Sequence, residues 1–312
     1  MFVVAGEALM DVFTGAATPT GLALDARIGG SPLNVAFGLA RMGQAVAFLG
    51  GVSQGQLGDR LAQALRDEGV SLEAVHRSAA PTTLSLVGLD ANGVPDYAFY
   101  GQGAADRCLP LAALDRLPAA TRAVHVGSYT MVVGETAKTQ AALVERAHGR
   151  HVVSYDPNLR LNVEPDVGVW RAALAWMLPR IDVLKLSDED LHLLYPDSDP
   201  VAFAADCLEK GAGLVALTRG GKGATAWHAH GTVEVAPVKV DVVDTVGAGD
   251  TFQAALLTRL AELEVLTPKG IRDLSTPALT DAMSFAVRAA AITCSRRGAD
   301  LPRRAELTPP RG

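Results

Sequence analysis

From Ala123 onward, short apolar runs alternate with longer amphipathic stretches, and this alternation constrains the fold more than any other feature of the sequence. The apolar runs predict strands at 123–127, 151–156, 181–186 and 214–218. The stretches between and after them predict helices at 135–148, 168–178, 188–195 and 200–210. Strands joined by crossover helices lie parallel in one sheet, with helices on its two faces. We therefore predict an α/β fold, doubly wound around a mostly parallel sheet.

The N-terminal third adds a smaller β structure to this pattern. Residues 83–89 and 94–100 alternate between apolar and polar side chains, and the turn sequence DANG at 90–93 separates them, which predicts a hairpin. Residues 12–28 are rich in Gly, Thr and Pro and have no helical period. The two segments together predict a small β flap, with 101–107 as its return hinge.

Hydrophobic periodicity predicts the remaining elements of the chain. Strands are expected at 2–5 and 46–52, and helices at 32–43, 57–66, 252–263 and 279–294. The sequence has no internal repeat and no low-complexity linker. We expect residues 1–312 to form a single domain, with flap segments at roughly 12–28 and 82–103 inserted in it.

Composition excludes several classes of partner. Hydrophobic residues make up 49% of the 312-residue chain and charged residues 20%, so a sizeable core is available and disorder is not expected. The net charge is −6, and no basic stretch is suited to nucleic acid or to an anionic membrane. Any phosphate site must therefore be local.

Cysteine usage points to a reducing compartment. Cys108, Cys207 and Cys294 are far apart and odd in number, which favours free thiols over a disulfide framework or a zinc site. The apolar run at the N-terminus is too short for a signal peptide, and no run reaches membrane-spanning length. We expect a cytoplasmic protein.

A glycine-rich loop opens the helix predicted from Phe252. Gly247 and Gly249 flank Ala248, so the backbone can turn tightly and approach a ligand closely. The first N–H groups of a helix have no intrahelical acceptor, and together with the helix dipole they favour an anion. The loop therefore predicts an anion-binding turn.

Asp250 places a carboxylate inside that turn. An Asp at a helix start often serves as the N-cap, which is one interpretation here. The preceding Gly-Ala-Gly favours another, in which Asp250 is a general base that takes the proton of a hydroxyl attacking a phosphoryl group.

A second glycine pair precedes another predicted helix. In GGSPLN at 29–34, Pro32 suits the first helical turn, and the glycines let a ligand reach the backbone. Asn34 offers both a donor and an acceptor, which matches the adjacent hydroxyls of a sugar. Asp11 is expected in a loop just after the first strand, either as a ligand contact or as an ordinary turn former.

Two further predicted strand ends carry polar residues. Arg160 in DPNLR at 156–160 is interpreted either as a contact to a phosphate or sugar oxygen or as a surface salt bridge. The segment TRGGKG at 218–223 lacks the spacing of a Walker loop, and a plain hairpin turn is the alternative to a ligand contact.

Several of these stretches resemble one known family, the ribokinase-like (PfkB) carbohydrate kinases. DTVGAGDTF at 244–252 resembles its C-terminal signature, and GGSPLN at 29–34 resembles its N-terminal one. DPNLR resembles an element of fructokinase-like members. The resemblance implies an anion hole made of Gly247, Ala248 and Gly249, with Asp250 as the base. It also implies sugar contacts from Asp11, Gly30, Asn34, Asn158 and Arg160.

The resemblance further implies sites for ATP and metal ions. Lys185 and Asp188 lie where the family has an Asn-x-x-Glu element, so Lys185 is expected at the ATP phosphates and Asp188 on Mg²⁺ through water, although both residue types differ from the family's. Nucleotide contacts are expected from Thr218, Gly220 and Gly223. A monovalent cation, K⁺ in our interpretation, is expected beside Asp244, Val246, Thr293, Arg296 and Gly298.

The implied activity is transfer of the γ-phosphate of ATP to a primary hydroxyl of a monosaccharide. The combined motifs look most like those of bacterial fructokinases, with 2-keto-3-deoxygluconate, ribose and nucleosides as alternative substrates. The flap would close over the sugar as a lid and form a homodimer contact. A dehydrogenase is disfavoured because the third glycine of its fingerprint is replaced by Phe252. A non-catalytic sugar-binding protein is disfavoured because it would not need Asp250.

Overall fold

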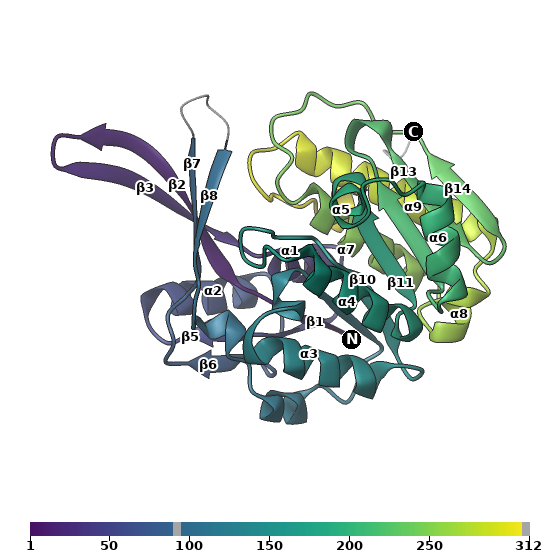
Figure 1. Cartoon of the computed structure of the whole chain (residues 1–312), viewed down its shortest axis with the longest axis horizontal. Helices are drawn as coiled ribbons and strands as arrows, with labels where there is room; N and C mark the ends of the chain where they lie inside the picture. Colours follow the sequence, from purple (N-terminus) through teal and green to yellow (C-terminus); the bar gives the residue numbers. More distant parts are fainter. Residues whose placement is uncertain (90–94, 308–312) are drawn as a thin grey trace.

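The computed structural model describes residues 1–89 and 95–307, and its largest element is an eight-stranded sheet (Figure 1). In spatial order its strands are β14 (Gly231–Val235), β13 (Ala224–His228), β12 (Leu214–Thr218), β11 (Val183–Ser187), β10 (Val152–Asp156), β9 (Ala123–Gly127), β1 (Phe2–Ala5) and β4 (Val46–Leu49). The strands from β12 to β4 pair in parallel, whereas β13 and β14 are antiparallel. The predicted mostly parallel sheet is confirmed.

Helices cover both faces of this sheet. One face packs against α1 (Ser31–Arg41), α2 (Gln56–Asp67), α7 (Ala248–Glu262), α8 (Pro268–Arg272) and α9 (Thr276–Cys294). The other packs against α3 (Gly134–Ala147), α4 (Val167–Met177), α5 (Asp188–Leu194) and α6 (Pro200–Glu209). Successive strand residues point to opposite faces, so Val4 joins the first core while Val3 and Ala5 join the second.

A four-stranded small sheet projects from the body of the molecule (Figure 1). Its strands, in order, are β3 (Gly21–Gly29), β2 (Leu9–Thr18), β7 (Leu84–Leu89) and β8 (Pro95–Tyr100). The predicted hairpin is confirmed as β7 and β8, while its predicted turn at 90–93 lies outside the described residues. The segment at 12–28 forms most of a second hairpin, β2 and β3.

Two predictions about the N-terminal strands are wrong. Asp11 lies within β2 of the small sheet and not in a loop after β1, because the chain turns at Gly6 and at once begins a new strand. The strand predicted at 46–52 is broken into β4 and β5 (Gly51–Ser53), and β5 pairs with β6 (His76–Ser78) in a separate sheet. Close packing explains the glycine at the start of β5, since a Cβ at Gly51 would lie 1.8 Å from the carbonyl oxygen of Ala105.

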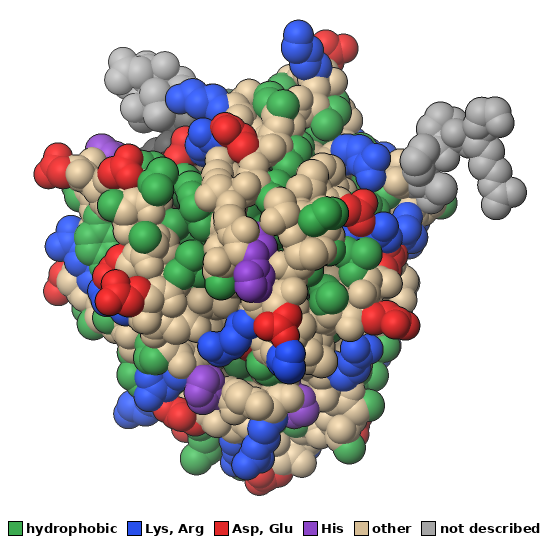
Figure 2. All heavy atoms as spheres, turned by 90° about the vertical axis from the view of Figure 1, so that its right-hand side faces the viewer, with side chains coloured by type: hydrophobic (Ala, Val, Ile, Leu, Met, Phe, Trp, Pro, Cys, Tyr) green, Lys and Arg blue, Asp and Glu red, His purple; other side chains and the backbone are tan. Residues whose placement is uncertain are grey.

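The surface of the described part carries charges of both signs. On the face shown in Figure 2, Lys and Arg side chains are interspersed with Asp and Glu side chains. Within residues 1–89 and 95–307, no helix has the length and apolar character needed to cross a membrane.

Candidate active site

A cavity of about 890 Å³ lies where the small sheet, the carboxyl ends of β11 and β12, and the first turns of α1 and α7 meet. Parallel strands end at the same edge of a sheet, which is where open α/β sheets bind ligands. The small sheet adds one face to the cavity, through Asp11, Phe13, Ser85, Val87 and Phe99. These side chains lie on one face because Asp11 pairs with Ser85, Phe13 with Val87 and Ser85 with Phe99.

The first turn of α7 forms the predicted anion-binding loop. Gly247 is the N-cap and has a left-handed backbone, with φ of 76°. A Cβ there would lie 2.7 Å from the Cβ of Ala299, so only glycine fits. No side chain caps the helix. The amide of Ala248 donates to the carbonyl of Thr245 at 3.2 Å, whereas within the described residues the amides of Gly249 and Asp250 have no acceptor and are left for a ligand. Gly247, Ala248 and Gly249 all line the cavity.

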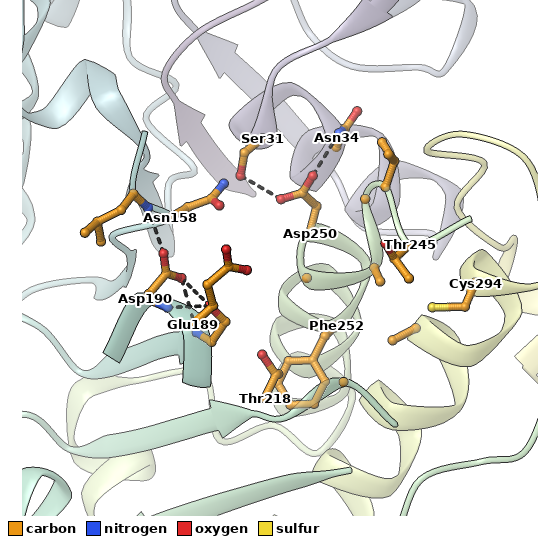
Figure 3. A pocket seen from close by; sticks show the side chains of 18 of the residues that line it. Ser31, Asn34, Asn158, Glu189, Asp190, Thr218, Thr245, Asp250, Phe252 and Cys294 are labelled. Carbon is orange, nitrogen blue, oxygen red and sulfur yellow. Dashed lines mark hydrogen bonds between the residues drawn. The ribbon is translucent and has the colours of Figure 1, made fainter. Parts of the chain in front are cut away.

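Asp250 is buried and connects α7 to α1 (Figure 3). Its Oδ1 accepts a hydrogen bond from Ser31 Oγ at 2.6 Å, and its Oδ2 accepts one from Asn34 Nδ2 at 2.8 Å. The N-cap is Gly247, so Asp250 does not cap the helix. Each carboxylate oxygen has about two acceptor sites and uses one here, so each can still accept a substrate hydroxyl. Sequence reasoning missed Ser31, although it stands inside the motif that contains Asn34.

Lys185 and Asp156 form an ion pair at the inner wall of the cavity. Lys185 Nζ donates to Asp156 Oδ2 at 2.7 Å, and both side chains are buried. The ammonium lies against α7, because a Cβ at Gly249 would come within 2.9 Å of Nζ. The predicted phosphate contact Lys185 is therefore beside the predicted anion hole, whereas Asp156 had no predicted role of its own.

Asp11 and Arg160 line the same cavity and are close enough for their charges to interact. Burial raises the pKa of Asp11, opposed by a hydrogen bond from Ser85 and by the charge of Arg160. Arg160 Nη1 donates to Asn158 Oδ1 at 2.9 Å and to the carbonyl of Leu159 at 2.8 Å. Within the described residues Arg160 forms no salt bridge, and it lines the cavity together with Asn158.

Glu7 is a buried carboxyl that sequence reasoning missed. It lines the cavity and is 2% exposed, and its Oε2 accepts a hydrogen bond from Thr130 Oγ1 at 3.1 Å. Burial raises its pKa to about 7. Its carbonyl also explains the nearby glycine, because a Cβ at Gly30, whose φ is 115°, would lie 2.6 Å from that oxygen. A Glu directly after a buried strand was the available signal.

Thr218, Gly220 and Gly223 line the cavity on the far side of α7 from the small sheet. They belong to the turn that joins β12 to β13, which is closed by the amide of Arg219 donating to the carbonyl of Gly223 at 2.8 Å. The segment 218–223 therefore forms the hairpin turn that one interpretation predicted, and it also lines the cavity, as the ligand-contact interpretation requires.

Asp188 is exposed at the start of α5, where it lines the cavity. Asp190, on the same helix, is buried instead, and it forms a capping box with Ser187. Asp190 Oδ1 also accepts from the amide of Leu159 at 2.9 Å, which ties this helix to the DPNLR segment. Within the described residues, no three His, Cys, Asp or Glu side chains are grouped closely enough to hold a metal by themselves.

The residues predicted around a monovalent cation come from two segments that the structure joins. Asp244 Oδ2 accepts from the amide of Gly298 at 2.8 Å, and Oδ1 accepts from the amide of Val246 at 3.1 Å. Thr293 Oγ1 lies 2.8 Å from Thr251 Oγ1 in α7. Arg296 donates its amide to the carbonyl of Thr293 at 3.0 Å. The loop before α7 is thus fastened to the end of α9.

Comparison with known proteins gives consistent results. The model of the pfkB family carbohydrate kinases matches residues 3–305. A fructokinase of Rhizobium leguminosarum bv. trifolii is 33% identical over 99% of this chain and 92% of its own length. Fructokinase-2 of Solanum lycopersicum is 32% identical over 87% of this chain and 82% of its own.

Solved structures agree with these sequence relatives. A fructokinase from Xylella fastidiosa with bound ATP superposes with a TM-score of 0.86 at 26% identity, over 98% of this chain and 96% of that one. A double mutant of a fructokinase from Vibrio cholerae O395, bound to fructose, ADP and potassium ion, gives a TM-score of 0.83 at 26% identity, with the same coverage. The protein therefore belongs to the pfkB family of carbohydrate kinases.

Proposed function

We propose that this kinase is an ATP-dependent fructokinase, which converts D-fructose to fructose 6-phosphate. The observation that carries the proposal is the placement of Asp250, a buried carboxylate held by Ser31 and Asn34 beside the open first turn of α7. A carboxylate next to an anion site suits a base that serves a phosphoryl acceptor. The fructokinases among the sequence relatives and solved structures support fructose as that acceptor.

In the proposed reaction, Asp250 takes the proton of the primary hydroxyl as the sugar oxygen forms a bond to the γ-phosphorus. The bond from that phosphorus to the bridging oxygen breaks, and ADP leaves with the electron pair. The amides of Gly247, Gly249 and Asp250, which have no acceptor within the described residues, stabilise the charge on the phosphoryl oxygens, and Ala248 shapes the turn between the two glycines. Lys185 contacts the phosphates from the cavity wall.

We assign the sugar to Asp11, Gly30, Asn34, Asn158 and Arg160, which line the cavity between Asp250 and the small sheet; Asn34, which also bonds to Asp250, lies where the sugar meets the base. Asp11 and Arg160 supply an acceptor and donors from two different layers of the fold. The small sheet acts as a lid whose approach excludes water from the phosphoryl group, which limits ATP hydrolysis.

ATP is assigned to the side of the cavity that contains Thr218, Gly220 and Gly223. Asp188 is an exposed carboxylate that lines the cavity next to a second one, Glu189. This suits Mg²⁺, because the ion keeps several waters and binds through one or two carboxylates plus phosphates. When bound, Mg²⁺ would neutralise phosphate charge. The remaining lone pairs of Asp244 fit K⁺, together with the carbonyls of Val246, Thr293, Arg296 and Gly298.

We further propose a cytoplasmic homodimer. The three cysteines are free, as expected in a reducing compartment. Leu22 and Leu24 on one face of the small sheet are 53% and 57% exposed, which favours a contact with a second copy through the lid. Light scattering on the protein and on a Leu22→Ser/Leu24→Ser variant tests the dimer; an unchanged mass would argue against this contact.

The activity is tested by ADP release in the presence of Mg²⁺ and each of five acceptors: fructose, ribose, 2-keto-3-deoxygluconate, glucose and adenosine. Fructose is expected to give the highest kcat/KM. A higher value for the keto-sugar acid or ribose would replace the substrate but keep the kinase, whereas no ADP release with any acceptor would contradict the kinase itself.

A further inference from the structure

A buried ion pair lies under the phosphoryl end of the cavity. Asp156 ends β10, and Lys185 lies on the neighbouring parallel strand β11, where Tyr155 pairs with Leu184. The side chains are 4% exposed for Lys185 and 2% for Asp156. Lys185 lines the cavity, whereas Asp156 does not and lies behind it. The carboxylate therefore contacts the ammonium from below the cavity floor.

The ammonium faces the anion-binding turn. A Cβ at Gly249 would lie 2.9 Å from Nζ, so the ammonium is next to this glycine. A lysine has three N–H donors, and Asp156 accepts from one of them. In the part of the chain that the structure describes, the other two donors have no acceptor, so they are available to groups in the cavity. Lys185 is thus a cation at a fixed place beside Gly247–Asp250.

Stability alone does not explain this pair. Removing two charges from water is unfavourable, and a buried ion pair is often no more stabilising than apolar residues of similar volume. Asp156 Oδ1 adds to the cost, because it is buried and has no hydrogen-bond partner within the described residues. The Lys185–Asp156 pair is unfavourable to bury, so its position beside the anion-binding turn is better explained by an effect on the bound anion than by stability.

The charges around the ammonium keep it protonated. Burial alone would lower the pKa of Lys185, but Asp156 on β10, Asp190 on α5 and Asp250 on α7 outweigh burial and raise it. His125 on β9 is the other titratable group in range, and burial together with Lys185 lowers its pKa to about 3, so it stays neutral. Of the three carboxylates, Asp156 has the largest effect on the pKa of Lys185, and within the described residues it is the one carboxylate that accepts a hydrogen bond from Nζ.

We propose that Asp156 is a positioning residue for phosphoryl transfer: it keeps the Lys185 ammonium charged and aimed at the first turn of α7. This inference rests on the proposed kinase function. There, as the γ-phosphorus forms its bond to the sugar oxygen and loses its bond to ADP, with the proton going to Asp250, the ammonium stabilises the charge on the phosphoryl oxygens. Asp156 acts on the reaction only through Lys185.

The test compares kcat and its pH dependence in Asp156→Asn, Lys185→Met and the double variant. Without its carboxylate partner the buried ammonium loses its proton more easily. On the alkaline side, the kcat of Asp156→Asn should therefore fall at a pH about one unit or more lower than the pH at which the wild-type kcat falls. Its kcat should recover as the pH is lowered. Lys185→Met should lose kcat by about 10²-fold at every pH, as for removal of one donor to a developing charge. The double variant should equal Lys185→Met, and fructose KM should change little in all three.

Asp182→Asn is the matched control. Asp182 is also buried, and its Oδ2 accepts from the amide of Val153 at 2.9 Å, so the same substitution disturbs the same two strands away from the cavity. It should keep the wild-type pH profile. Asp156→Glu keeps the charge and should retain the wild-type profile with a smaller loss of kcat than Asp156→Asn, which provides a second measurement if the Asn variant does not fold.

Two outcomes would overturn the inference. One is a folded Asp156→Asn whose kcat has the wild-type pH profile. If that variant does not fold, the corresponding outcome is an Asp156→Glu variant that loses kcat at alkaline pH. The other is a double variant whose loss equals the product of the two single losses. Failure of the kinase function itself is recognised separately, because the wild-type protein would then release no ADP with any sugar.

Discussion

The two ends of the cavity are built differently. At the phosphoryl end, both charged groups are held by buried partners: Asp250 by Ser31 and Asn34, and Lys185 by Asp156. At the sugar end, the hydrogen bonds that Arg160 makes within the described residues are all to its own loop, and Asp11 lies on the small sheet that projects from the body (Figure 1). The first end is preorganised for charge that develops during reaction. The second end is complete only when the small sheet and the body of the molecule both contact the sugar. We therefore expect substitutions at the phosphoryl end to lower kcat and substitutions at the sugar end to raise fructose KM.

The largest effect is expected at the phosphoryl end. Asp250→Asn keeps the size and much of the hydrogen bonding of the side chain but cannot accept the substrate proton. General-base catalysis is worth about 10²–10⁴ in rate, so kcat should fall by that order while fructose KM changes less. Ser31→Ala is the control, because it removes one hydrogen bond to Asp250 and leaves the carboxylate. If Asp250→Asn kept more than about a tenth of wild-type kcat with chemistry limiting, Asp250 would not be the base.

A smaller effect, on a different parameter, is expected at the sugar end. Asp11→Ala removes an acceptor that bonds to Ser85 and faces the cavity. A hydrogen bond to a charged group contributes about 1.5–3 kcal/mol, so fructose KM should rise about 10- to 150-fold, with kcat nearly unchanged. Steady-state kinetics with fructose as the varied substrate measures both. A loss of kcat as large as that of Asp250→Asn would remove the distinction between the two ends.

The root of the small sheet should give a still smaller change. Asp106 is buried between Thr83, which precedes β7, and Tyr129, whose hydroxyl donates to Asp106 Oδ2 at 2.7 Å. Tyr129→Phe removes that donor and keeps the edge-on ring contact with Phe99 of β8. We expect a several-fold rise in fructose KM, because the small sheet is then anchored less firmly.

Thermal unfolding of Tyr129→Phe separates this effect from a general loss of structure. Loss of one hydrogen bond to a buried carboxylate costs about 1.5–3 kcal/mol of unfolding free energy. Thr258→Val, a change in α7 at a hydroxyl without a partner in the described residues, is the control and should not raise fructose KM. An unchanged KM in a destabilised Tyr129→Phe would mean that this contact supports folding but not sugar binding.

The same contrast explains how much could be predicted from the sequence. The sheet, its helices and the loop before α7 are local patterns, so periodicity and the Gly-Ala-Gly-Asp motif predict them. The bond between Ser31 and Asp250 joins residues 219 positions apart, and no local pattern encodes it. The pairing of Asp156 with Lys185 depends on strand register: Tyr155 pairs with Leu184, so the next residue of each strand, Asp156 and Lys185, can meet. Asp11 was misplaced because a glycine turn and a new strand begin within a few residues of β1.

The smallest expected effect concerns the loop that leads into the preorganised end. Asp244 joins the segment before α7 to Gly298 after α9, and it lies outside the cavity lining that would touch fructose or phosphate. A cation bound there would order Gly247–Asp250 without touching substrate, so K⁺ should raise kcat and leave fructose KM nearly unchanged. Rates are compared in K⁺ and in tetramethylammonium at matched ionic strength, with Asp244→Asn as the variant that should respond less. Equal rates in the two salts would show that the contacts of Asp244 to Val246 and Gly298 are sufficient to order the turn without an ion.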